Sequence, residues 1–249
     1  MRDLLSAVLR LAELETPPRP LEIPRELSEL VTPCGEGGKP IEYYAVDSGY
    51  VVQRVGPRDI LIQSIVAVGR DIKRKYIVTT VTGDPHVEAR IREIRFAEFI
   101  NSDIVLVDGP LTPYVNTARI IGVSKDPRLA RYGPRIPDAD LRDKFTKLSR
   151  YVGERGLVEA LLARAPSGSY LPPVDLGELA GTFFKSDWVI YVEFPKSYRP
   201  EALCQLFRRY PIRLRLAHHL AKVNREYLKT VKIMLSTVLG APPRFRDFL

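Results

Sequence analysis

Two aspartates at the ends of short apolar runs could hold a divalent metal together. Asp47 follows the apolar and aromatic residues 41–46, and Asp108 follows the apolar residues 104–107. Each aspartate leads into a segment with glycine, which is typical of a turn. If the two runs are neighbouring strands, their carboxylates lie side by side, and paired carboxylates bind the metals used in phosphoryl chemistry. Either segment alone is more typical of an ordinary turn, so the evidence for a metal site comes from the pair.

The segments around these acids predict a meander, a helix and a further strand. Runs rich in β-branched and aromatic residues at 41–46, 50–55, 60–68 and 73–81 are separated by turn residues, which predicts antiparallel strands. A helix is expected at about 85–100, with Asp84 as N-cap and Pro85 in its first turn. The strand at 104–107 follows. The connection through the helix is long enough to place this strand parallel to an earlier one.

The predicted helix at 85–100 offers a third acid, Glu93. At about 100° per residue the apolar side chains fill one broad arc, and Glu93 falls inside this arc whereas Glu88 lies opposite. A buried carboxylate is costly unless it has a partner. Two partners remain open, namely an ion pair with Arg90 or another arginine, and the same metal as Asp47 and Asp108.

Composition and cysteine usage limit the classes to which the protein can belong. The chain of 249 residues has 38 Lys and Arg against 30 Asp and Glu, a net charge of +8, which suits a polyanionic partner. No apolar run is long enough for a membrane span and the N-terminus lacks a secretory signal, so we expect a cytoplasmic protein. Cys34 and Cys204 stand in no metal-binding spacing, and we expect two ordinary small apolar residues rather than a disulfide. Abundant proline with few Asn, Gln, Cys and Met indicates a thermophilic source.

The remaining chain supplies more helices and a basic loop. Helices are predicted at 3–15, 24–30, 139–150, 154–164, 201–210 and 211–239, and strands at 119–123 and 188–194. The loop 124–137 carries Lys125, Arg128, Arg131 and Arg135. Such a loop is typical of a contact with the backbone of single-stranded DNA, and equally of a solvated surface. His218 lies beside the apolar stripe of the last helix and, taken alone, is typical of an ordinary core or surface histidine.

Four motifs, in this order, resemble the archaeal NurA nuclease family. They are Ala45-Val46-Asp47-Ser48-Gly49, Leu106-Val107-Asp108-Gly109-Pro110-Leu111, Gly122-Val123-Ser124-Lys125, and the late Tyr210-Pro211 with Ala217-His218, so the resemblance spans roughly residues 41–220. The first motif reads Asp-Ser-Gly where the family more often has Asp-Gly-Ser. The second has Pro110 where serine is usual, and the chain is short for the family.

This resemblance implies a function and a set of site residues. The family fold is ribonuclease H-like, and its members are homodimeric, Mn²⁺-dependent nucleases, with Mg²⁺ as the alternative ion. They digest 5′ ends of DNA, cut single strands, and work with the hexameric helicase HerA in processing double-strand breaks. By motif, Asp47, Glu93 and Asp108 would be metal ligands. Tyr210 and His218 would complete the site, His218 as a further ligand, as a residue that orients water, or as a proton donor; Glu88 and Glu98 remain alternatives to Glu93.

We therefore expect one nuclease domain over residues 1–249. Its parts are an N-terminal helix and connector at 1–40, catalytic strands and helix at 41–125, and a helical part that completes the site at 126–249. The expected fold class is α/β, with a mixed ribonuclease H-like sheet of five or six strands, flanking helices and helical extensions at both ends. The expected partners are single- and double-stranded DNA, a HerA-like hexamer and a second copy of the chain. The alternatives are a non-catalytic nucleic-acid-binding subunit and a nuclease that acts on RNA.

Overall fold

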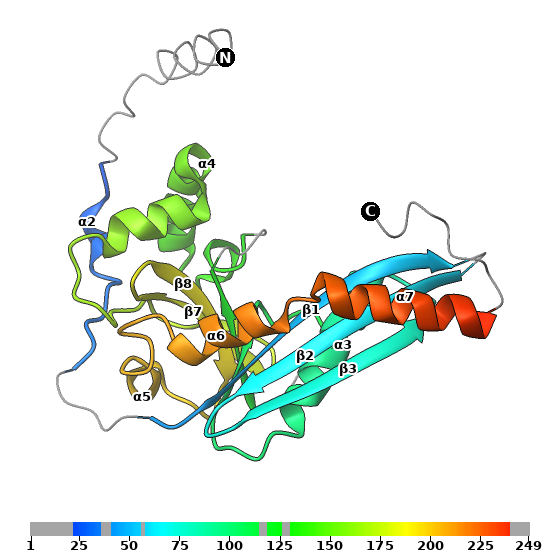
Figure 1. Cartoon of the computed structure of the whole chain (residues 1–249). Coiled ribbons are helices and arrows are strands. Elements are labelled where there is room, and N and C mark those ends of the chain that lie inside the picture. Colours follow the sequence, from blue (N-terminus) through cyan, green and yellow to red (C-terminus); the bar gives the residue numbers. More distant parts are fainter. Residues whose placement is uncertain (1–21, 36–40, 56–57, 115–118, 126–129, 240–249) are drawn as a thin grey trace, which may run out of the picture.

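A computed structural model describes residues 22–35, 41–55, 58–114, 119–125 and 130–239. The helix predicted at 3–15 and the tail at 241–249 lie outside this part of the chain. Its centre is an eight-stranded sheet in the order β3-β2-β1-β4-β5-β8-β7-β6 (Figure 1). The strands are β1 Tyr44–Val55, β2 Arg58–Val68, β3 Ile72–Thr80, β4 Val105–Asp108, β5 Ile120–Ser124, β6 Val174–Leu176, β7 Leu179–Lys185 and β8 Val189–Pro195.

The pairing of these strands confirms the predicted fold class. β1, β2 and β3 are antiparallel neighbours, and β4 lies parallel to β1 and to β5. The length of the connection through the helix at 85–98 predicts this parallel orientation of β4. Eight strands exceed the predicted five or six. β6 has only three residues, and in β7 the small residues Ala180 and Gly181 follow Leu179, so neither segment stands out as a strand.

One predicted turn is wrong. β1 continues through Asp47-Ser48-Gly49 and pairs with β2 along its whole length. Gly49 is needed for a close approach and not for a turn, since a Cβ at this position would lie 2.6 Å from the carbonyl oxygen of Ala221. The second aspartate does lead into a turn, where Gly109 has a φ of 94° that favours glycine.

The helices largely follow the predicted segments and end at different residues. They are α2 Arg25–Ser28, α3 Pro85–Glu98, α4 Ala139–Leu162, α5 Pro200–Leu203, α6 Ile212–Ala221 and α7 Arg225–Leu239, with the short 3₁₀ helix η1 Gly133–Arg135. The Asp84 side chain caps α3 as predicted, accepting from the backbone N–H groups of His86 and Val87. No helix in the described part of the chain is long and apolar enough to cross a membrane.

One pair of predicted helices is confirmed, and two other helix predictions need correction. The helices predicted at 139–150 and 154–164 are the two arms of α4, which are separated by the non-helical backbone of Gly153 (φ 76°, ψ 160°). The helix predicted at 201–210 is reduced to the short α5. The helix predicted at 211–239 is divided at residues 222–224 into α6 and α7, where the backbone of Lys222 is extended. No proline or glycine marks this break.

Different helices cover the two faces of the sheet, and strand alternation assigns the acids to one of them. Ala45 of β1 and Leu106 of β4 lie in the core cluster that contains α6. Val46 and Val107, the next residue of each strand, lie in the cluster that contains α3. Because successive side chains of a strand point to opposite faces, the aspartate that follows each valine lies on the α6 face.

Cys34 and Cys204 form a disulfide with their Cα atoms 5.7 Å apart, so the expectation of two ordinary apolar residues is wrong. The bond joins the segment after α2 to the end of α5. The two cysteines are 170 residues apart in the sequence, and this separation has no recognisable spacing. Only the folded chain brings them together.

We expect reduction of this disulfide to lower the thermal stability. Opening a cross-link over 170 residues returns loop entropy to the unfolded chain, worth about 5 kcal/mol, which lowers the Tm by roughly 15 °C. Calorimetry with and without reductant measures the shift. Cys34→Ser/Cys204→Ser is the control, and its Tm should not respond to reductant. Equal Tm values for the oxidised and reduced protein would contradict the assignment.

Candidate metal centre

Three side chains from three elements meet on the α6 face of the sheet. Asp47 of β1, Asp108 at the end of β4 and His218 of α6 each offer one ligand atom, and these atoms all lie within 4.8 Å of one another. His218 Nδ1 lies 2.7 Å from Asp47 Oδ2 and 3.5 Å from Asp108 Oδ2. The structure therefore places the two predicted carboxylates side by side and adds the predicted histidine.

Packing of α6 on the sheet carries His218 to the acids. Leu214, Ala217 and Ala221 form the buried stripe of this short helix. His218 follows Ala217 at the border of the stripe, with its side chain 53% exposed. The backbone of Ala221 rests against Gly49, two residues along β1 from Asp47. Helix and strand are thus fixed to each other next to the acids.

Asp47 lies in an environment that disfavours a carboxylate charge. It is 7% exposed, and one oxygen accepts the backbone N–H of Ser48 at 2.7 Å. Burial and, after it, the charge of Asp108 together raise the pKa of Asp47 to about 7. The positive charges that partly offset these effects are those of Arg90 and of Lys125, whose ammonium lies 3.6 Å from Asp108 Oδ2. A divalent cation between the acids would remove their repulsion.

Glu93 is buried as predicted, and its two oxygens differ. Oε2 accepts from Arg90 Nη1 at 2.9 Å and from Ser48 Oγ at 3.1 Å, so the ion pair with Arg90, one of the two open alternatives, is formed. Oε1 is buried and has no hydrogen-bond partner among the described residues. Burial raises the pKa of Glu93, and the charge of Asp47 raises it further. Glu93 lies outside the three-residue cluster, and its role as a metal ligand stays a prediction.

The alternative acid Glu88 is engaged elsewhere. Its Oε1 accepts the backbone N–H groups of Thr82 and Gly83, each at 2.9 Å, and its Oε2 pairs with Arg92 at 3.0 Å. These bonds hold the start of α3 rather than the acid cluster. Glu93, which lies in the apolar arc of the helix, therefore remains preferred over Glu88 as the candidate ligand.

Tyr210 and Lys125 lie at the edge of the acid cluster. The hydroxyl of Tyr210 is buried without a hydrogen-bond partner among the described residues. Burial raises the pKa of Tyr210, and the charges of Asp108 and Asp47 raise it further. Lys125 Nζ lies 4.9 Å from the centre of the Tyr210 ring. Lys125, predicted as a phosphate contact, is therefore also a neighbour of the acids.

Of the other predicted phosphate contacts, Arg131 is engaged inside the protein and Arg135 is exposed. Arg131 has a side chain that is 14% exposed, and its Nη1 lies 2.9 Å from the carbonyl oxygen of Thr112 and 3.2 Å from Glu193 Oε1. Arg135 is exposed and donates to the backbone of Arg131. Arg128 lies outside the described residues. The structure ties Arg131 to an internal carboxylate, and a DNA contact by the loop stays a prediction.

Two residues that were not predicted hold the turn after Asp108. Arg90 donates to the carbonyl oxygens of Asp108 and Pro110. Glu193 of β8, fully buried, accepts the backbone N–H groups of Leu111 at 2.7 Å and Thr112 at 2.8 Å. Neither residue belongs to a motif. The available signal for Glu193 was a single carboxylate inside an otherwise apolar run at 189–195.

Comparisons with known proteins agree with this geometry. A family model described as the NurA domain matches residues 42–223. The crystal structure of the NurA nuclease from Sulfolobus solfataricus has a similar fold, with 11% sequence identity, coverage of 98% of this chain and 96% of that chain, and a TM-score of 0.53. A structure of NurA bound to dAMP and manganese has 12% identity, coverage of 99% and 96%, and a TM-score of 0.52. A comparison with curated proteins gave no match.

At such low identity the structural likeness establishes the fold alone. The family model adds the sequence evidence, because its match runs from before Asp47 to beyond His218 and covers more than half of the chain. The chain therefore belongs to the NurA family.

Proposed function

We propose that this protein is a metal-dependent nuclease that hydrolyses phosphodiester bonds of DNA. One observation carries the proposal, namely that Asp47, Asp108 and His218 converge within 4.8 Å on the sheet of a NurA domain. A relative of the same fold is bound to dAMP and manganese, which supports a nucleotide and a divalent ion as ligands. The alternative function is that of a non-catalytic nucleic-acid-binding subunit, which would bind DNA without cleaving it.

The residues at the cluster fit a hard divalent ion. Carboxylate oxygens suit Mn²⁺ and Mg²⁺, and imidazole nitrogen favours the softer Mn²⁺. We propose Mn²⁺, with Mg²⁺ as the alternative, held by Asp47, Asp108 and His218. The unpaired Oε1 of Glu93 is the proposed fourth protein ligand. Its other oxygen is fixed by Arg90, which orients the carboxylate.

The protein side chains then have separate tasks in hydrolysis. When bound, a divalent metal lowers the pKa of a water nucleophile and neutralises charge on the phosphate. Arg90 and Glu193 fix the turn that carries Asp108. The buried hydroxyl of Tyr210 can donate a hydrogen bond to a phosphate oxygen. The Lys125 ammonium adds positive charge where charge develops on the phosphate.

For the biological role, we propose processing of DNA ends. The activities would be 5′→3′ exonuclease and single-strand endonuclease activity, in double-strand break repair with a HerA-type helicase. A homodimer is proposed as the active form. The described surface supports a protein contact, because exposed apolar residues of β3 and α7, among them Val78, Met234 and Val238, line a groove of about 360 Å³.

We predict that Asp47→Asn and Asp108→Asn each lower Mn²⁺-dependent cleavage by about 100-fold or more, because each removes a charged ligand. End-labelled single-stranded DNA, double-stranded DNA and RNA, incubated with and without Mn²⁺, provide the measurement. Asp175→Asn, in an exposed ion pair with Lys196, is the matched control and should cleave normally. Full cleavage by either site variant would refute the site, and cleavage of RNA alone would favour the ribonuclease alternative.

The pKa of Asp47 predicts a pH-dependent stability. Because this pKa is raised from the ordinary value of 3.8 to about 7, its protonated form stabilises the metal-free fold below about pH 4, and the effect is lost as the pH rises through about 7. The raised pKa of Glu93 acts in the same direction. We expect the Tm of the metal-free protein to fall between pH 5 and 8, and to fall less in Asp47→Asn.

Added Mn²⁺ should reverse this trend, because it binds the charged carboxylates and stabilises the folded state. The rise in Tm at saturating Mn²⁺ is expected to be larger at pH 8 than at pH 6. A metal-induced shift that is absent, or that persists in full in Asp47→Asn/Asp108→Asn, would show that the cluster holds no metal.

The proposed homodimer predicts a particle of twice the 28.2 kDa chain mass in light scattering at micromolar concentration. Met234→Glu/Val238→Glu places charges in the apolar groove and should shift the mass toward that of one chain. Phe99→Glu, at an exposed apolar residue at the end of α3, is the control and should stay dimeric. A one-chain mass for the unmodified protein would rule the dimer out, and co-purification with a HerA-type helicase tests that partner separately.

A further inference from the structure

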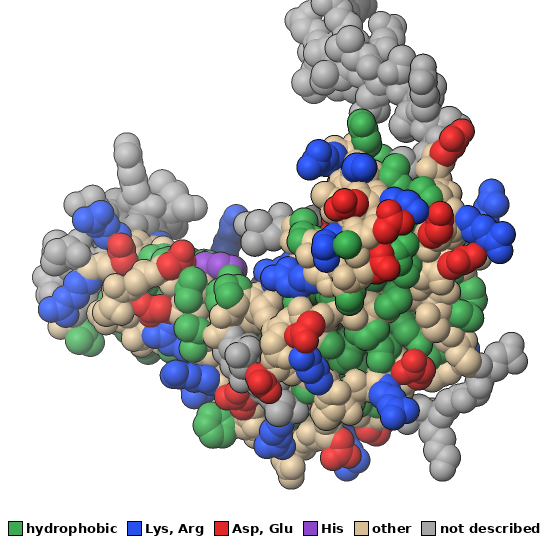
Figure 2. All heavy atoms as spheres, turned by 180° about the vertical axis from the view of Figure 1, so that it is seen from behind, with side chains coloured by type: hydrophobic (Ala, Val, Ile, Leu, Met, Phe, Trp, Pro, Cys, Tyr) green, Lys and Arg blue, Asp and Glu red, His purple; other side chains and the backbone are tan. Residues whose placement is uncertain are grey.

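The junction between α6 and α7 carries cations directly beside the acid cluster. Residues 212–239, which form the two helices and their junction, contain six Lys or Arg and one acid, Glu226. Figure 1 shows this junction between two parts of the molecule, the lobe formed by β1–β3 and α7 and the body that contains α4. The junction lies at the base of the space between them. In the view from behind, a hollow separates the lobe from the body, and Lys and Arg side chains border it (Figure 2).

The backbone of Lys222 lies beside the site. Its Cα is 3.3 Å from where a Cβ on Gly49 would stand, and Gly49 is two residues along β1 from Asp47. Lys222 directly follows the last residue of α6, four residues beyond His218. A ligand that reaches His218 therefore passes within reach of Lys222.

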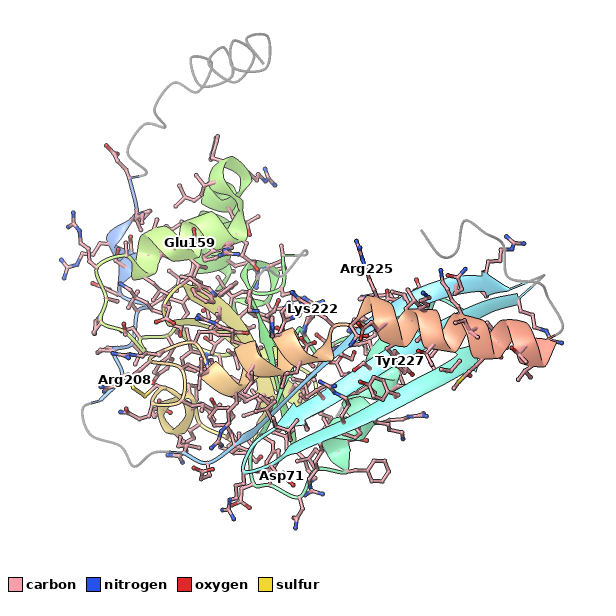
Figure 3. All side chains as sticks on the ribbon, viewed as in Figure 1. Asp71, Glu159, Arg208, Lys222, Arg225 and Tyr227 are labelled. Atoms are coloured by element: carbon pink, nitrogen blue, oxygen red, sulfur yellow. A yellow bond between two sulfur atoms is a disulfide. The ribbon has the colours of Figure 1, made fainter. Side chains whose placement is uncertain are left out.

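Arg225 is the first residue of α7 and lies three residues beyond Lys222. Figure 3 shows the two side chains at the helix junction. Both are exposed, and neither forms an ion pair with an acid in the described part of the chain. An arginine at the start of a helix is disfavoured by the helix dipole. Local helix stability therefore does not favour an arginine at position 225, whereas binding of a polyanion would favour it.

We infer that Lys222 and Arg225 bind phosphates of single-stranded DNA adjacent to the phosphate at the acid cluster. The inference rests on the proposed nuclease function and assigns one wall of its substrate cleft. Lys125 lies at the opposite side of the acids, next to Asp108. Unpaired ammonium and guanidinium groups attract the backbone irrespective of base sequence, so the strand is held by its charge along the α6–α7 junction.

The test compares Lys222→Ala/Arg225→Ala with a variant of equal charge loss. Arg95→Ala/Lys147→Ala is the matched control, because these residues are exposed cations on α3 and α4. Binding of labelled single-stranded DNA of two unrelated sequences is measured without divalent metal over a range of salt concentrations. Loss of two phosphate contacts is expected to weaken binding roughly tenfold for both sequences and to lower the salt slope by about 1.4. Lys222→Arg/Arg225→Lys should bind as the unmodified protein does.

Mn²⁺ binding by calorimetry separates this inference from the proposed function. The expected result is unchanged Mn²⁺ affinity in Lys222→Ala/Arg225→Ala together with weakened DNA binding. Unmodified protein that binds neither Mn²⁺ nor DNA refutes the proposed function itself. With that function intact, an unchanged affinity and salt slope in the variant overturns the inference. Equal losses in the variant and in the Arg95/Lys147 control overturn it too, because net charge alone would then explain the binding.

Discussion

The parallel pairing of β1 with β4 holds two carboxylates together against their mutual repulsion. The register places Val46 opposite Val107, so the next residues, Asp47 and Asp108, leave the paired region at the same level. Both are held on the face that α6 covers, where burial makes the charge of Asp47 costly. The fold offsets this cost with the hydrogen bond from the Ser48 backbone and with the cationic groups of Arg90 and Lys125.

Two supporting residues hold the turn after Asp108 from the α3 face of the sheet, opposite the face that carries the acids. On the α3 face, Arg90 binds both Glu93 and the turn after Asp108, so one guanidinium aligns a third acid with the second. Glu193 binds the same turn from β8. Removing either residue would leave buried polar groups unpaired, which costs more than the bond itself. The position of Asp108 thus depends on groups that are distant in the sequence.

The sequence allowed prediction of what depends on local pattern. The strand that ends at Asp108, the capped helix α3 and the burial of Glu93 all follow from side-chain periodicity. The turn at Asp47-Ser48-Gly49 was wrong because glycine serves a close approach there, and this is visible only with α6 in place. The Cys34–Cys204 bond and the role of Glu193 depend on contacts between distant segments. The break between α6 and α7 has no glycine or proline to mark it, so a continuous amphipathic pattern concealed it.

The order of the two small residues after Asp47 also sets the distance from β1 to the helix on each face of the sheet. Ser48 points toward α3, where its hydroxyl reaches Glu93, and Gly49 turns a bare Cα toward α6, where the helix backbone rests on it. In a chain that reads Asp-Gly-Ser, the hydroxyl would face α6 and the bare Cα would face α3. The strand would then hold the histidine helix farther away and lose its bond to the third acid. Exchanging Ser48 and Gly49, which leaves the composition unchanged, would therefore alter the distances between the four candidate ligands.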